Sequence, residues 1–231
     1  MKYILGLVFV FFSVVMVAQE NLAYRGEFIR KAIIKENLNV VGKDYIYNEY
    51  NKGMLVLHDS IFSKQDYLKY DIYNDRVLIK YDLNSNDVLE ISDNSLTAFS
   101  IFEIGNNLKH DFVRLFGSSF EDGVGEGFYE IVYNLQNTNY FIKKNAKIIF
   151  DPNRSKGSQT ENNLPREFKD KNTYYIKNNE GLYAKVLLKK KSILKVLNKH
   201  PKLVSSFIKG KKINFRKESD VIKLVNYYKS L

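Results

Sequence analysis

The sequence has no cysteine and no tryptophan, and only three of its 231 residues are proline. The absence of cysteine excludes disulfide bonds, thiol chemistry and a lipid attached through cysteine, so the packed core alone must stabilise the fold. Tyrosine (17) and phenylalanine (16) are abundant. These aromatic residues favour half-buried positions in β-sheets, and the lack of tryptophan weakens the alternative of a sugar-stacking surface.

Motifs for catalysis or cofactor binding are also missing from the sequence, including the serine-hydrolase elbow and the zinc-protease motif. Two histidines have acidic neighbours, His58 beside Asp59 and His110 beside Asp111, but adjacent strand residues point to opposite faces. The glycine-rich segment 123–127 lacks the Lys-Ser/Thr pair of a nucleotide-binding loop. We therefore expect packed or surface histidines, a flexible connector at 123–127, no catalytic residues, no cofactor and no metal.

Long apolar runs are absent after the first eighteen residues. Lys2 precedes an apolar run over 4–17, and the pattern predicts an export signal, residues 1–18, cleaved between Ala18 and Gln19. A helix of about fourteen residues spans about 21 Å, which is less than the roughly 30 Å hydrocarbon core of a bilayer. A retained anchor is the alternative, since Met16 stands where a smaller residue is usual. We expect an exported protein, periplasmic rather than extracellular, whose mature chain has no transmembrane span.

Period-two alternation of apolar residues predicts strands from Gly53 onward. Turn residues predict hairpins over 67–81, 88–102, 112–135, 128–143 and 173–188, whereas the segment 19–50 fits a helix or a strand equally. Short connections favour antiparallel pairing of successive strands. We expect an α+β fold, mostly an antiparallel β meander (a twisted sheet, a sandwich or a partial barrel), with short C-terminal helices.

Three amphipathic stripes predict these helices. Their apolar residues are Ile193, Val196 and Leu197; Leu203, Val204, Phe207 and Ile208; and Val221, Leu224, Val225 and Tyr228. Ser192 and Ser219 are the expected N-caps, Pro201 fits a first helical turn, and Gly210 is the expected stop. The predicted organisation is a β-rich body over 19–188, with a polar linker or long loop at 151–166, and a basic helical region over 189–231 packed on the body.

Positive charge is concentrated at the C-terminal end of the chain. The net charge is +10, and residues 185–231 hold fourteen Lys or Arg residues against two acidic residues. Arg216 is the only arginine of this segment, which suits diffuse attraction to an anionic surface better than bidentate phosphate recognition. The candidate binding residues are Lys189, Lys190, Lys191, Lys195, Lys199, Lys202, Lys209, Lys211 and Lys212. The alternative is that these lysines are solvated helix faces that cover apolar surface.

Several segments together resemble a group of uncharacterised exported proteins common in Bacteroidota. They are YIYNEY at 45–50 with Lys52 and Gly53, LKYDIYND at 68–75, GFYEI at 127–131 and ESDVIKLVNYY at 218–228. The resemblance covers most of the mature chain and implies no activity and no functional residues. In that lineage, Asp59-Ser60-Ile61 is similar to a short O-glycosylation signal. The C-terminus does not resemble a type-nine sorting domain, which favours retention in the periplasm.

The leading hypothesis is a non-enzymatic envelope protein that contacts an anionic envelope component or another envelope protein through its basic helices. Nucleic acid is not expected as a partner. The alternatives are a hydrolase-like enzyme that uses scattered Asp, Glu and Tyr residues, and a carrier of a small apolar ligand. Paired carboxylates in one deep pocket would favour the enzyme, and a closed apolar cavity would favour the carrier.

Overall fold

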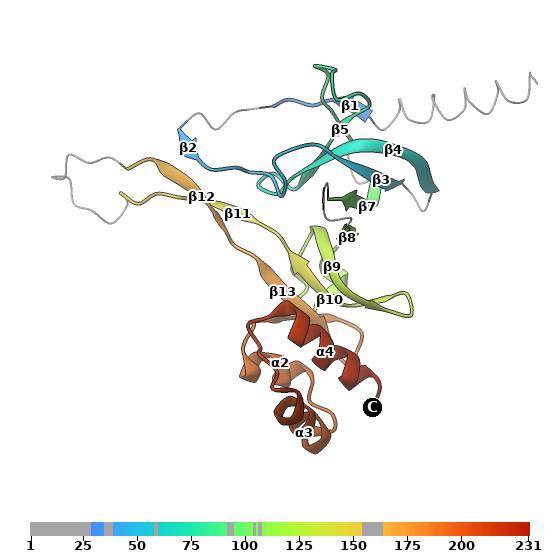
Figure 1. The fold of residues 1–231 in the computed structure, drawn as a ribbon, viewed down its shortest axis with the longest axis vertical. Coiled ribbons are helices and arrows are strands. Elements are labelled where there is room, and N and C mark those ends of the chain that lie inside the picture. The colour runs from blue at the N-terminus through green and yellow to red at the C-terminus, as the bar shows by residue number, and fades with distance from the viewer. Residues whose placement is uncertain are drawn as a thin grey trace, which may run out of the picture.

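The fold is an open antiparallel sheet with three helices at one end (Figure 1). This computed structural model describes residues 29–34, 39–57, 60–91, 95–103, 105, 108–153 and 164–231. The predicted signal, its cleavage site at Ala18 and Gln19, and the pair His58 and Asp59 lie outside these ranges. The strands of the main sheet are β1 (Ile29–Lys31), β3 (Asn51–Leu57), β4 (Ser60–Asp71), β5 (Arg76–Lys80), β6 (Leu89–Ile91), β7 (Leu96–Phe102), β8 (Lys109–Leu115), β9 (Gly127–Leu135), β10 (Thr138–Lys144), β13 (Thr173–Lys177) and β14 (Tyr183–Val186).

The main sheet has 11 strands in the order β1-β6-β5-β4-β3-β7-β8-β9-β10-β13-β14, and its ladders are antiparallel. The sheet is not closed, but it curls strongly. In a flat sheet β4 and β9 would lie about 19 Å apart, four strand spacings. The rings of Tyr70 on β4 and Phe128 on β9 nevertheless have centroids 6.2 Å apart. The α+β fold class predicted from the sequence is confirmed, as a curled open sheet.

Aromatic side chains fill the inside of this curl. Phe99 and Phe112 stack at 4.5 Å, and the ring of Tyr70 meets both edge-on at 5.2 Å. All three are at most 1% exposed, as are Leu68 and Ile79 from the hairpin β4–β5. Offset and edge-to-face pairs of this kind add to the free energy gained from burial alone. The abundant phenylalanine and tyrosine therefore do serve sheet packing.

The turn between β4 and β5 reaches across the curl and fastens its two sides. The Asp75 carboxylate accepts hydrogen bonds from the Tyr70 hydroxyl and the Phe128 amide, and it forms a 2.7 Å ion pair with Lys144 on β10. Gly127, with φ of +108°, opens β9 beside this carboxylate, and a Cβ at that position would lie 1.7 Å from Asp75 Oδ2. The close approach of the turn to β9 therefore requires glycine.

A second, smaller sheet continues two strands, β10 and β13, that lie near the β14 edge of the main sheet. It consists of β11 (Lys147–Phe150), β12 (Arg166–Asp170) and β2 (Val40–Val41), in the order β11-β12-β2. Because β10 runs into β11 and β12 runs into β13, the four strands form one long antiparallel ribbon that projects from the main sheet (Figure 1). Phe168 of this ribbon packs edge-on against Tyr73 at 5.2 Å, which braces it on the hairpin β4–β5.

The helices α2 (Lys190–Val196), α3 (Pro201–Lys211) and α4 (Glu218–Lys229) share a core with the last strands. Ile193, Val221, Leu224 and Val225 are fully buried against a wall that includes Phe141 of β10. The wall also contains Ile176 of β13 and Val186 of β14, and Tyr133 on β9 donates a 2.6 Å hydrogen bond to Asn226 on α4. The predicted helices and most of their apolar stripes are confirmed, although Leu203 is 49% exposed. Across the described ranges, no helix combines the length and apolar composition that a membrane crossing needs.

Four predicted hairpins are confirmed, namely β4–β5, β8–β9, β9–β10 and β13–β14. The predicted hairpin over 88–102 is wrong. β6 pairs with β5 and β1, β7 pairs with β3 and β8, and three strands lie between β6 and β7 in the sheet. Long-range packing decides this pairing, because Phe99 and Ile101 of β7 belong to the aromatic core. The predicted linker was also too long at its end, since Arg166 already belongs to β12.

Three predicted helix ends need correction. Ser192 and Ser219 lie inside α2 and α4, whose N-caps are Lys189 and Lys217. Ser192 Oγ instead accepts a 2.9 Å hydrogen bond from the Leu187 amide. Gly210 does not stop α3. The helix continues to Lys211 and ends where Lys212 adopts a left-handed conformation, which places the buried side chain of Ile213 against the core.

Candidate functional site

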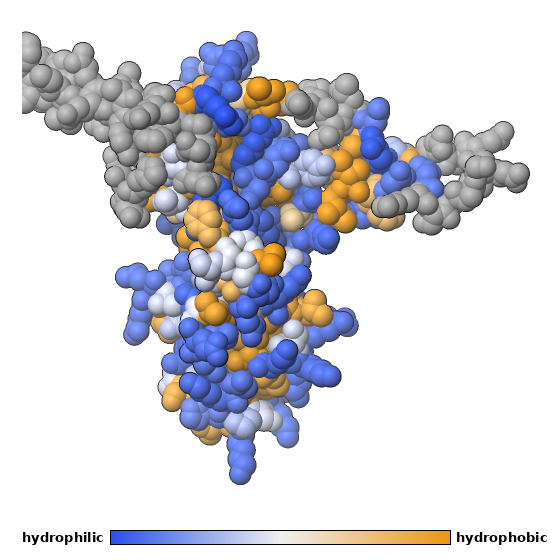
Figure 2. Space-filling model, turned by 180° about the vertical axis from the view of Figure 1, so that it is seen from behind, coloured by the Kyte–Doolittle hydropathy of each residue, from blue (hydrophilic) through white to orange (hydrophobic). Residues whose placement is uncertain are grey.

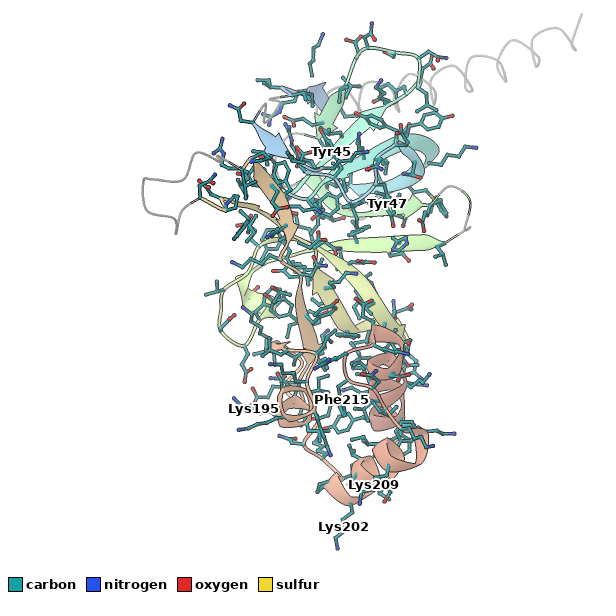
Figure 3. The ribbon with its side chains drawn as sticks, turned by 60° about the vertical axis from the view of Figure 1, so that its left-hand side comes forward. Tyr45, Tyr47, Lys195, Lys202, Lys209 and Phe215 are labelled. Carbon is teal, nitrogen blue, oxygen red and sulfur yellow. The ribbon has the colours of Figure 1, made fainter. Side chains whose placement is uncertain are left out.

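The nine candidate lysines form one basic surface around α2 and α3, which we call the basic end. Lys189, Lys190, Lys191 and Lys195 lie at the start and on the outer side of α2. Lys199 and Lys202 flank the turn between the helices, and Lys209, Lys211 and Lys212 lie at the end of α3. All nine are exposed. Figure 3 shows Lys202 and Lys209 at the tip of the molecule and Lys195 on its side. On the face that Figure 2 shows, hydrophilic side chains project from the outline of this end, with hydrophobic ones between them.

The acidic residues of the described ranges do not neutralise the basic end. From Lys189 to Lys217 the sequence holds eleven Lys or Arg residues and no Asp or Glu. Within the described residues, none of the nine lysines has an ion-pair partner. Elsewhere lysines do pair, as Lys144 does with Asp75 and Lys147 with Asp170. The positive potential of this end is therefore directed to solvent.

The fold holds these like charges close together. The turn between α2 and α3 is fixed by the Tyr228 hydroxyl, which accepts a 3.2 Å hydrogen bond from the Lys199 amide and donates one to Asn179. At the start of α2 three lysines follow one another, and its first turn has no acidic residue. Repulsion among clustered charges of one sign opposes folding. The packing of α2, α3 and α4 on the sheet therefore has to offset this repulsion.

No family model, curated protein or solved structure matches the chain. What the protein does must therefore be inferred from its geometry.

A buried charged cluster joins the curled sheet to the helical end. Glu130, on β9, is 8% exposed, and both of its carboxylate oxygens have partners. Oε1 lies 2.9 Å from His110 Nδ1, and Oε2 lies 2.7 Å from both Lys143 Nζ and Asn145 Nδ2. Lys143 also lies 3.6 Å from Glu218, the first residue of α4.

The charges of this cluster control the titration of its members. Burial alone raises the pKa of Glu130, but the hydrogen bond from His110 and the positive charge of Lys143 outweigh burial and lower the pKa to about 2. The hydrogen bond to Glu130 raises the pKa of His110 above its ordinary value of 6.5, against the opposing effect of burial. Glu130 is thus a carboxylate throughout the physiological range, and the ring of His110 is held toward its charged form.

Further contacts around the Glu130 cluster hold its neighbouring elements together. The Tyr174 hydroxyl donates a 2.6 Å hydrogen bond to Glu218, which fastens the start of α4 to β13, and burial raises the pKa of Tyr174. The Tyr47 ring, labelled in Figure 3, meets the His110 ring edge-on at 5.7 Å. His110 Nε2 lies 3.9 Å from Glu103 and has no hydrogen-bond partner in the described chain. A carboxylate whose oxygens are both occupied is suited to binding elements together rather than to proton transfer.

The sequence did not reveal this cluster, although one signal was present. In β9 the alternation puts Glu130 on the same face as Phe128 and Val132, so an acidic residue stands where the pattern expects an apolar one. The predicted interpretation of His110 as a packed histidine agrees with its place here. Its neighbour Asp111 points elsewhere and accepts a hydrogen bond from Ser100.

The glycine-rich segment and the acidic and histidine side chains were the other candidates, and among the described residues they form no metal site. Segment 123–127 lies in the connection between β8 and β9, after a 3-10 turn, η2 (Gly117–Ser119), so it joins strand to strand as predicted. In the described part of the chain, no group of three or more His, Asp or Glu side chains is arranged to hold a metal ion. One polar pocket of about 330 Å³ lies between Asn178, Glu121 and Lys195, and a smaller pocket lies between α2 and α3.

Proposed function

We propose that the protein is an exported, non-enzymatic module of the cell envelope that attaches to an anionic membrane surface through its basic end. The observation that supports this is the cluster of nine exposed lysines that no acidic side chain of the described chain neutralises. A lysine near an anionic membrane contributes about 1 kcal/mol of binding, so several acting together suffice for electrostatic attachment.

Reversing the charge of three lysines of the basic end tests the proposal. Replacing Lys195, Lys202 and Lys209 by glutamate should weaken binding to vesicles of phosphatidylglycerol and phosphatidylcholine by about 100-fold or more, since each removed contact accounts for about 1 kcal/mol. Binding of the wild type should also fall steeply with rising salt, because its attraction is electrostatic. Co-sedimentation of the full chain with vesicles at several salt concentrations measures both effects.

The matched control changes the same net charge elsewhere. Lys43, Lys52 and Lys171 are exposed and lie away from the helical end, so their replacement by glutamate should leave most of the binding intact. Equal loss of binding in both triple variants would mean that only the net charge matters, and the basic end would then have no special role. Failure of the wild type to bind anionic vesicles at low salt would overturn the proposal itself.

A further inference from the structure

A small apolar pocket opens between α2 and α3, within the basic end. Its apolar lining comes from Leu194 and Leu197 of the α2 segment and from Pro201, Val204 and Ile208 of α3. The spacing of these residues places them on the facing sides of the two helices. The volume is about 180 Å³, which is the bulk of about six water molecules.

The size of the pocket restricts what it can hold. Sites that enclose a whole small ligand have volumes of roughly 300–1,000 Å³. This pocket is smaller, and it therefore fits an apolar segment of a molecule whose remainder stays outside. The turn between α2 and α3, which joins the two walls of the pocket, is held by the hydrogen bond from the Lys199 amide to the Tyr228 hydroxyl.

One lysine lines the pocket and a second is next to it in the sequence. Lys190 is a lining residue, one helical turn before Leu194, and the exposed Lys202 directly follows the lining residue Pro201. Figure 3 places Lys202 at the tip of the molecule. A ligand with an apolar segment inside the pocket would thus present its adjoining group to ammonium groups, which favours an anionic group at that position.

Exposed apolar side chains point to the same partner. Leu187, just before α2, is 59% exposed, and Leu203 on α3 is 49% exposed. A soluble polyanion such as an acidic glycan offers nothing for these side chains, whereas the boundary between lipid head groups and acyl chains accepts both leucines and lysines.

We infer that the pocket between α2 and α3 takes a short segment of one acyl chain, next to the head group of an anionic membrane lipid, while the surrounding lysines contact the head groups. This inference rests on the proposed function and refines it, because it adds lipid insertion to electrostatic attachment. It distinguishes a lipid surface from an equally charged surface without acyl chains.

Two neighbouring serines of α3 allow a matched test. Both are exposed, but only Ser205 lines the pocket. Ser205→Phe should fill the pocket and weaken binding to phosphatidylglycerol vesicles about tenfold, with binding to polyphosphate unchanged. Ser206→Phe should bind both like the wild type. Equal vesicle binding by the two variants would overturn the acyl-chain inference and leave the electrostatic proposal standing.

A measurement on the unaltered protein covers the case in which Ser205→Phe fails to fold. Dihexanoyl phosphatidylglycerol, below its micelle-forming concentration, should shift the methyl NMR signals of Leu194, Leu197 and Val204. Glycerophosphoglycerol, which has the same head group without acyl chains, should leave these signals in place. Absence of methyl shifts with the six-carbon lipid would refute insertion, whereas loss of all vesicle binding would refute the proposed function as well.

Discussion

A chain that ends at Lys189 is expected not to fold. Removal of α2, α3 and α4 would expose Phe141, Ile176 and Val186, which are at most 2% exposed in the intact protein. Burial of each such side chain contributes about 1.5–3 kcal/mol, so the loss from these three alone is about 6 kcal/mol. That is comparable with the whole stability of a typical domain, about 5–15 kcal/mol. Far-UV circular dichroism and urea titration of the shortened chain measure the effect.

A point substitution gives the graded version of this experiment. Leu224→Ala, at a fully buried position of α4, should lower the free energy of unfolding by about 3 kcal/mol. Leu203→Ala, at a 49% exposed position of α3, should change it by less than about 0.5 kcal/mol. If the shortened chain unfolded with the wild-type urea midpoint, the sheet would be stable without its helices. Because we expect the shortened chain not to fold, its loss of binding would not test the basic end, and surface charge reversal is needed instead.

Glu130→Gln is expected to lower the free energy of unfolding by about 3 kcal/mol, because it leaves Lys143 and His110 without the carboxylate that they share. The matched control is Glu126→Gln. Glu126 is 64% exposed and lies 3.4 Å from Arg114, so its loss should cost less than about 0.5 kcal/mol. Urea unfolding of the three proteins at pH 6 compares them. Similar midpoints for the two variants would contradict a stabilising role of the buried cluster.

The Glu130–His110 pair also predicts how the stability difference between the wild type and Glu130→Gln depends on pH. The pKa of Glu130 is lowered from 4.5 to about 2, so its contribution is complete above about pH 4.5 and is lost as the pH falls toward 2. The pKa of His110 is raised, so its contribution is complete below about pH 6.5 and is lost as the pH rises through the folded-state value. The difference in stability should be largest between about pH 4.5 and 6.5. A difference that stays constant from pH 3 to 9 would exclude the Glu130 pair as its source.

Residue patterns within short stretches of sequence predicted the hairpins and helices that those stretches form. The hairpin β4–β5 follows from alternation on either side of Asn74 and Asp75, and α4 follows from the spacing of Val221, Leu224, Val225 and Tyr228. The pairing of β3 with β7 does not follow from sequence, since it joins segments that are distant in the chain and depends on how Phe99 packs against Tyr70 and Phe112. Short-range signals also misplaced the end of α3, because burial of Ile213 outweighed the helix-stopping tendency of Gly210.

The candidate site also has features that the sequence predicts and features that depend on the tertiary structure. Charge is a property of composition, so the lysines of the basic end could be named from the sequence. The structure adds that they are exposed and that no acidic side chain among the described residues pairs with them. The pocket between Leu194 and Ser205 could not be named, since it depends on the angle at which two helices meet. The Glu130 cluster brings together residues from β8, β9, β10 and α4, and only the acidic interruption of an apolar strand indicated it.

Lys143 and Lys144 are neighbours in β10, and each is paired with a different carboxylate, Glu130 for the first and Asp75 for the second. Successive residues of a strand face opposite ways, so a slip of β10 by one residue against β9 would break both pairs at once and bury two ammonium groups without partners. The error would also move Phe141 away from the helices and Ile142 out of its own apolar contacts. Two adjacent lysines thus specify the register of β10 against β9.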